Sequence, residues 1–225
     1  MAITLTFLGH SGFLIDDGTH AVAVDPFLTG NPLARHKPAD ITCQYIALTH
    51  GHADHFGDTI DIARRNDATV IAPFEVCEYC REKGLPEGRL DPGNPGGRVY
   101  SDFGHVAFTP AIHSSSYEGR YMGPSCGLII NIGGVKIYHC GDTALFSDMK
   151  LIGQIAAPDI ACIPVGDRFT MTPNLGKIAA EFIKPKVAIP IHYKTFPLLT
   201  DDISEFTPEG VQVKVMEPGE SWHYG

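Results

Sequence analysis

Three histidines and one aspartate lie within six residues, in the segment 49–55 with the sequence Thr-His-Gly-His-Ala-Asp-His. Imidazole nitrogens and carboxylate oxygens are good ligands for zinc and its neighbours in the first transition row. Unliganded imidazoles packed this closely repel one another when protonated, so a segment without a function has little reason to contain them. The segment therefore predicts a metal site. Its candidate ligands are His50, His52, Asp54 and His55.

Three distant residues extend this set of candidate ligands. Each follows an apolar stretch that is typical of a strand, and they are His113, Asp142 and His192. Residues at the same end of neighbouring strands can converge on one rim of a sheet, where α/β proteins often bind ligands. One metal ion takes about four ligands, and a catalytic ion leaves one position for water. Seven protein ligands, with Asp142 shared, suit two metals bridged by a hydroxide.

Short strands alternate with helices along the chain, which predicts an α/β layered fold. We expect strands at 3–7, 13–15, 21–24, 45–48, 69–72, 98–100, 105–109, 127–132, 135–138, 160–165, 186–190 and 211–216. We expect helices at 57–66, 74–83, 149–155, 173–183 and 201–206, with loops at 84–97 and 114–125. No change in composition marks a domain boundary, so we expect one domain spanning residues 1–225. A weak repeat, from Gly9-x-Ser11 to Asp25 and from Gly123-x-Ser125 to Asp142, fits two β-rich halves packed as a sandwich.

The composition excludes several classes of protein. With 44% hydrophobic and 19% charged residues, the chain has the composition of a globular protein that buries a core. A net charge of -9 argues against nucleic acid as a partner, although a metal cluster could still attract a small anion. No apolar segment approaches the roughly 20 residues that span a bilayer, and residues 1–8 lack the pattern of a signal peptide. Six cysteines do not suggest a disulfide framework, so we expect the reducing cytoplasm. The sequence leaves the oligomeric state open, a homo-oligomer included.

The complete ligand pattern resembles that of the metallo-β-lactamase superfamily, and this resemblance covers almost the whole chain. Finer features resemble a subgroup, the uncharacterised metal-dependent hydrolases related to L-ascorbate-6-phosphate lactonase. These features are Gly9-His10-Ser11, Asp25-Pro26-Phe27, His113-Ser114-Ser115, Gly141-Asp142-Thr143, Phe169-Thr170-Met171 and Ile191-His192-Tyr193. The resemblance implies a four-layered αββα sandwich with the site at one edge.

The resemblance also implies how the ligands divide between two divalent transition-metal ions. His50, His52 and His113 would hold the first ion. Asp54, His55 and His192 would hold the second, and Asp142 would bridge the two. Zinc is the first expectation, while Mn, Fe, Co and Ni also accept such ligands.

Two such metals lower the pKa of a bridging water, so that a nucleophilic hydroxide exists near neutral pH. Asp54 is a candidate catalytic residue, which would accept a proton and donate it to the leaving group. The expected activity is hydrolysis of a small ester, lactone or phosphoester. A metal-dependent redox enzyme and a non-catalytic metal-binding sensor remain alternatives, and the lack of a flavin-binding companion domain weakens the first.

Weaker candidates surround these residues. His10 and Asp25 could orient a metal-binding histidine, or they could stabilise a turn and cap a loop. Arg168, Tyr193 and Lys194 could contact an anionic small molecule, or they could be solvated surface residues.

Other reactive residue types are interpreted structurally. Residues 114–116 predict a hydrogen-bonding loop, because a metal hydroxide makes a serine nucleophile unnecessary. Cys77 and Cys80 are interpreted as two thiols on an ordinary helix, and Cys140 as a core residue.

Overall fold

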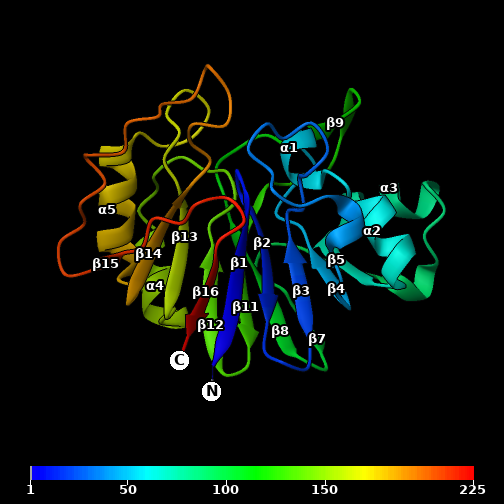
Figure 1. Ribbon diagram of the computed structural model, residues 1–225. Coiled ribbons are helices and arrows are strands. Elements are labelled where there is room, and N and C mark those ends of the chain that lie inside the picture. The colour runs from blue at the N-terminus through cyan, green and yellow to red at the C-terminus, as the bar shows by residue number, and fades with distance from the viewer. Residues whose placement is uncertain (1) are drawn as a thin grey trace.

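Two seven-stranded sheets face each other in the computed structural model, which describes residues 2–225 (Figure 1). The first sheet contains, in spatial order, β16 (Ser221–Tyr224), β1 (Ile3–Gly9), β2 (Gly12–Asp16), β3 (Ala21–Val24), β4 (Tyr45–Ala47), β5 (Thr69–Pro73) and β6 (Leu90–Gly93). The second contains β15 (Gln212–Val213), β14 (Val187–Ile191), β13 (Ile160–Pro164), β12 (Val135–His139), β11 (Cys126–Ile132), β8 (Gly104–Pro110) and β7 (Arg98–Ser101).

Helices cover the outer face of each sheet. Those on the first sheet are α1 (Ala53–Phe56), α2 (Thr59–Asn66) and α3 (Phe74–Glu82), and those on the second are α4 (Met149–Ala156) and α5 (Pro173–Ile183). Short 3-10 helices occur at Pro38–Asp40 and Glu87–Arg89. The predicted αββα order of layers is confirmed. None of the helices between residues 2 and 225 combines the length and the apolar character needed to cross a bilayer.

The main core lies between the two sheets. On β1 the buried Ile3, Leu5 and Phe7 alternate with less buried Thr4 and Thr6, as the sequence pattern predicts for a half-buried strand. Burying one such aliphatic or aromatic side chain stabilises the fold by about 1.5–3 kcal/mol. Separate apolar clusters attach the helices to the outer faces. The apolar core between the sheets therefore stabilises the sandwich, and the edges of the sheets remain available for a functional site.

Strand direction brings the site segments to one edge. Strands β3, β4 and β5 run parallel, and so do β12, β13 and β14. Strand β8 has the same direction as β12, because both pair antiparallel with β11. The loops that leave these strands therefore start at the same rim, with α1 at the upper edge in Figure 1.

Several local predictions were wrong. Segment 57–66 is helical only from Thr59, and the separate α1 precedes it. The expected loops contain β6 and a hairpin formed by β9 (Ser116–Tyr117) and β10 (Arg120–Tyr121). The expected helix at 201–206 is a series of turns, since the Asp202 side chain accepts a hydrogen bond from the backbone of Ser204 and so competes with helix formation.

The carboxyl-terminal strands also differ from expectation. The strand expected at 211–216 is limited to β15, and β16 follows it. Strand β16 pairs antiparallel with β1, and its Trp222 lies opposite Leu5. Trp222 and Tyr224 pack against the main core, which explains why this short strand forms.

Candidate metal centre

The backbone is strained at three residues around the site. His10, Asp25 and His192 have φ values of 57°, 41° and 58°, a region that L-residues rarely adopt. Each such residue costs about 1–3 kcal/mol, and the cost is borne mainly at functional sites. The backbone N–H of His192 donates to the carbonyl oxygen of His10 across 2.8 Å, which joins two distant segments. Gly166 packs so closely here that a Cβ atom would lie 1.8 Å from the carbonyl oxygen of His192.

His50, His52 and His113 form the first cluster of potential ligands. One nitrogen from each lies within 4.8 Å of the other two. His50 Nε2 is 2.9 Å from His52 Nδ1. The loops after β4 and β8 supply these residues, so the structure brings together the three histidines that the family resemblance assigns to one ion.

Asp54, His55 and His192 form the second cluster, together with His10. Asp54 Oδ2 is 3.7 Å from His192 Nε2 and 3.1 Å from His10 Nε2. Asp54 and His55 lie on α1, whose short turn presents both side chains beside the loop that follows β14. His10 is therefore adjacent to the predicted ligands, where sequence reasoning had left its role open.

Asp142 lies between the two clusters. Its Oδ2 atom is 2.9 Å from His192 Nε2 and 3.4 Å from His113 Nε2, and its Oδ1 atom is 3.2 Å from His55 Nε2. The carboxylate thus contacts members of both sets. This is the arrangement expected of a bridging ligand.

Asp25 orients residues of both clusters through hydrogen bonds. It is fully buried and accepts hydrogen bonds from Thr49 N at 2.9 Å, Thr49 Oγ1 at 2.6 Å and His55 Nδ1 at 2.7 Å. Because the Thr49 hydroxyl proton goes to Asp25, its oxygen is free to accept from His50 Nδ1, which is 2.9 Å away. In their neutral forms both histidines therefore carry the proton on Nδ1, and each Nε2 then has a lone pair that a metal can bind.

Burial keeps the histidines of the first cluster neutral. Desolvation lowers the pKa of His52 and His113 below the ordinary value, and it lowers that of His50 well below it. Metal binding requires the neutral imidazole, so burial favours the state that a metal would bind.

The carboxylates reverse this effect in the second cluster. Burial opposes the charged form of His55, but Asp142 and Asp25 outweigh it and raise the pKa of His55 well above the ordinary value. Burial is likewise outweighed by Asp142 at His192, whose pKa is raised to about 9. The same ion pairs hold the pKa of Asp142 well below its usual range against the effect of burial.

The donor atoms fit a divalent metal. His55 Nε2 and Asp142 Oδ1 are buried 3.2 Å apart, and neither atom has a partner with hydrogen-bond geometry among the described residues. Buried polar atoms without partners are rare, and a bound cation would satisfy both of them. Imidazole and carboxylate donors suit zinc and its first-row neighbours.

The other candidates lie outside the clusters. Tyr193 is buried in the core beneath α5, and Lys194 Nζ pairs with Glu217 at 3.3 Å. The Arg168 guanidinium lies 5.7 Å from the centre of the exposed Phe169 ring. A hollow of about 680 Å³ opens over the two clusters, and none of these three residues lines it. Their positions therefore do not support a contact with an anionic substrate.

The serine loop has the hydrogen-bonding role that the sequence predicts. Ser115 Oγ accepts from Gly51 N and donates to the carbonyl oxygen of Met122, at 3.1 and 3.2 Å. Ser114 Oγ lies 3.2 Å from His52 Nε2. Cys77, Cys80 and Cys140 are buried free thiols, as expected.

Sequence reasoning missed the wall of the site. The apolar wall of the hollow over the two clusters comprises Phe169, Phe196, Pro197, Leu198 and Leu199. These residues come from the loops after β13 and β14. Large apolar residues just beyond two predicted strand ends were the signal that could have identified them.

Comparisons with known proteins agree with this geometry. A family model described as a beta-lactamase superfamily domain matches residues 4–192. A UPF0173 metal-dependent hydrolase from Carboxydothermus hydrogenoformans is 45% identical over 225 residues, which cover 96% of this chain and 97% of that protein. A second, from Anoxybacillus flavithermus, is 46% identical over 224 residues and covers 96% and 98%.

A solved structure resembles the chain over its whole length. Igni18, a metallo hydrolase from the hyperthermophilic archaeon Ignicoccus hospitalis, is 34% identical with a TM-score of 0.90. The match covers 100% of this chain and 99% of that one. The two-sheet fold of this chain is thus shared with a metallo hydrolase of known structure.

Proposed function

The chain belongs to the beta-lactamase superfamily and is a metal-dependent hydrolase, and from that premise we propose that it hydrolyses a small ester, lactone or phosphoester at a pair of divalent metal ions. The observation that carries this proposal is Asp142, whose two oxygens contact histidines from both clusters. A single ion would leave one of the two clusters without a role.

Seven residues are proposed as ligands. His50, His52 and His113 would hold one ion, Asp54, His55 and His192 the other, and Asp142 both. When bound, the pair would supply a hydroxide nucleophile near neutral pH and would polarise the oxygen of the bond under attack. Zinc is the ion that we expect first.

Asp54 is the proposed proton carrier. Its side chain is 28% exposed, and it lines the hollow where a leaving group would emerge. Burial opposes its charge, but hydrogen bonds with His10 and His192 outweigh burial and hold the pKa of Asp54 well below its usual range. His10 is a positioning residue, since its Nε2 atom fixes Asp54 Oδ2 at 3.1 Å while its Nδ1 atom contacts Thr195 Oγ1 at 2.9 Å.

We further propose that residues 1–225 form one metallo-hydrolase domain. The two sheets share a continuous core, and the family match spans strands of both sheets. The proposed ligands come from loops of both sheets, so neither half contains a complete set.

Metal analysis coupled to a substrate screen tests the function. Protein purified without added metal is analysed for its elements, loaded with zinc, and assayed with lactones, p-nitrophenyl esters and phosphodiesters. We expect turnover of at least one class, and its loss on chelation. No turnover of any class at full metal occupancy would favour a sensor. An iron-dependent spectrum that changes on reduction, together with oxygen consumption, would favour a redox enzyme.

A further inference from the structure

The hollow over the clusters has two different surfaces. Its floor is polar and consists of five of the proposed ligands and Ser114. Its wall consists of Phe169, Phe196, Pro197, Leu198 and Leu199. Phe169 and Leu198 are 52% and 56% exposed, although they are large apolar side chains. Single exposed apolar residues are ordinary, but several that line one concave surface mark a binding site.

Hydrogen bonds fix the two loops that carry this wall. Thr200 N donates to the carbonyl oxygen of Gly166 across 3.1 Å and so joins one loop to the other. Within the loops, Asp167 N donates to the Met171 carbonyl oxygen and Lys194 N to that of Thr200, both at 2.9 Å. The wall is therefore formed before any ligand arrives, which reduces the entropy lost on binding.

The wall offers no charge to a substrate. Within residues 2–225, no Lys or Arg lines the hollow. Lys194 is paired with Glu217 at 3.3 Å, and Arg168 lies over the Phe169 ring outside the lining. A charged group placed against this wall would lose water without gaining a partner, which is costly. Phosphoryl transfer commonly uses Arg or Lys beside its metals, and this wall supplies neither.

We propose that the wall binds the uncharged apolar group of a carboxylic ester or lactone whose carbonyl lies over the His/Asp clusters. The inference rests on the proposed function and narrows it to one substrate class. Each methylene buried against the wall should increase kcat/KM by up to about fourfold. A substrate with a charged group away from the reacting carbonyl would not fit this wall, because the wall has no Lys or Arg to pair with that charge.

A matched set of esters tests this class with the zinc-loaded protein. The set comprises p-nitrophenyl acetate, butyrate and hexanoate, mono-p-nitrophenyl adipate, and bis(p-nitrophenyl) phosphate. The adipate has the chain length of the hexanoate and a terminal carboxylate. We expect kcat/KM to increase from acetate to hexanoate and to fall at least tenfold for the adipate. An adipate or phosphodiester hydrolysed faster than hexanoate, or a hexanoate no better than acetate, would overturn the inference.

Two matched variants assign the effect to the wall. Leu198→Lys places a cation in the hollow, whereas Leu151→Lys places one on α4, where the leucine is 53% exposed. We expect Leu198→Lys to reduce the preference for hexanoate over adipate at least tenfold at unchanged zinc content, and Leu151→Lys to leave it unchanged. Arg168→Gln should also leave it unchanged. Equal behaviour of the two lysine variants, or a preference that depends on Arg168, would contradict the proposal.

A binding measurement separates this inference from the proposed function. Metal-free protein is titrated with hexanamide and with acetamide and followed by NMR. We expect hexanamide to shift resonances of residues 166–171 and 193–200 more strongly than acetamide does. Such shifts without any hydrolysis would contradict the proposed function alone. Hydrolysis without such shifts would contradict the apolar wall alone.

Discussion

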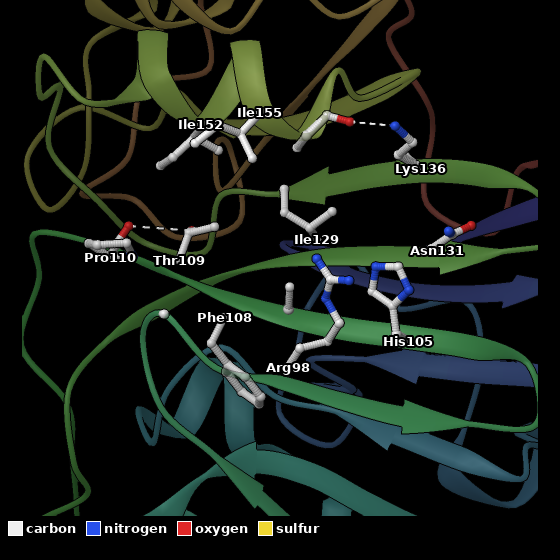
Figure 2. Close-up of a pocket in the computed structure, with 13 residues that line it drawn as sticks. Arg98, His105, Phe108, Thr109, Pro110, Ile129, Asn131, Lys136, Ile152 and Ile155 are labelled. Atoms are coloured by element: carbon white, nitrogen blue, oxygen red, sulfur yellow. Dashed lines mark hydrogen bonds between the residues drawn. The ribbon is translucent and has the colours of Figure 1, made fainter.

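Two hollows of similar size lie on this molecule and differ in the chemistry of their linings. The hollow over the clusters has about 680 Å³, and a second, between α4 and the outer face of the sheet strands β7, β8 and β11, has about 510 Å³. Figure 2 shows the second, where Arg98 and His105 point into the space below Ile152 and Ile155. Size therefore does not distinguish the site from the rest of the surface.

The polar groups of the second hollow serve the fold or face water. Lys136 Nζ donates to the carbonyl oxygen of Ala156 across 2.7 Å, near the end of α4 (Figure 2). Burial, with Arg98 and Lys136 nearby, lowers the pKa of His105. No group of potential metal ligands occurs there among residues 2–225. What marks the first hollow is thus the convergence of imidazole and carboxylate lone pairs, and what marks the second is positive charge.

Removing the shared carboxylate should have the largest effect. Asp142→Ala takes away the group that contacts both clusters, so we expect loss of bound zinc and a fall in kcat/KM of about 1000-fold or more. His105→Ala in the second hollow is the control and should leave both unchanged. Activity and metal content like those of the unmodified protein in Asp142→Ala would contradict the bridging role.

Neutralising the proton carrier should have the next largest effect. Asp54→Asn removes the base but keeps a side-chain oxygen, so we expect zinc content to remain mostly intact while kcat falls about 100-fold or more. The exposed Asp61 on α2 gives a matched control as Asp61→Asn. Equal activity of the two variants would exclude the proton-transfer role of Asp54.

Loosening the support beneath the site should have a smaller effect. Asp25→Asn weakens the acceptor of His55 Nδ1–H and Thr49, so we expect zinc affinity to fall about 10–100-fold in a competition titration with a chelator. Asp159, whose carboxylate accepts from Lys136 N beside the second hollow, provides the control Asp159→Asn. A circular dichroism melt checks that both variants fold, and equal zinc affinity would argue against the supporting role.

The smallest expected effect is the change in stability of the metal-free protein with pH. The folded-state pKa values of His55 and His192 are raised, the latter to about 9, so their contribution to stability is complete below pH 6.5 and is lost as the pH rises toward 9. We expect the Tm of metal-free protein to fall over this range, and zinc binding at pH 7 to release protons. Calorimetry in buffers of different ionisation enthalpy measures that release. Binding without proton release would show that these histidines are already neutral.

Local sequence patterns predicted an α/β layered fold and the candidate ligands, whereas the αββα order of layers came from the family resemblance. The alternation at Ile3, Leu5 and Phe7 is a local signal, and the structure contains the strand that it predicts. His50, His113, Asp142 and His192 could be anticipated because each one follows a strand end. The helix expected at 201–206 does not form, because the side chain of Asp202 accepts a backbone hydrogen bond that competes with helix formation.

Long-range contacts could not be predicted in the same way. Thr49 orients His50 only because Asp25, from an earlier strand end, takes its hydroxyl proton. The strained φ of His192 depends on a backbone bond to His10, far away in the chain. The position of Leu198 in the wall depends on how two loops are joined by Thr200. These features depend on contacts between segments that are far apart in the chain and meet only at the edge of the folded sandwich.

A stoichiometric zinc titration tests the central proposal most directly. Metal-free protein receives increasing zinc, and bound metal and hydrolysis of a p-nitrophenyl ester are measured on the same samples. We predict two tightly bound ions per chain and an activity that reaches its plateau at the second equivalent. A plateau at one equivalent, or two bound ions without hydrolysis of any ester, lactone or phosphodiester, would contradict the two-metal hydrolase.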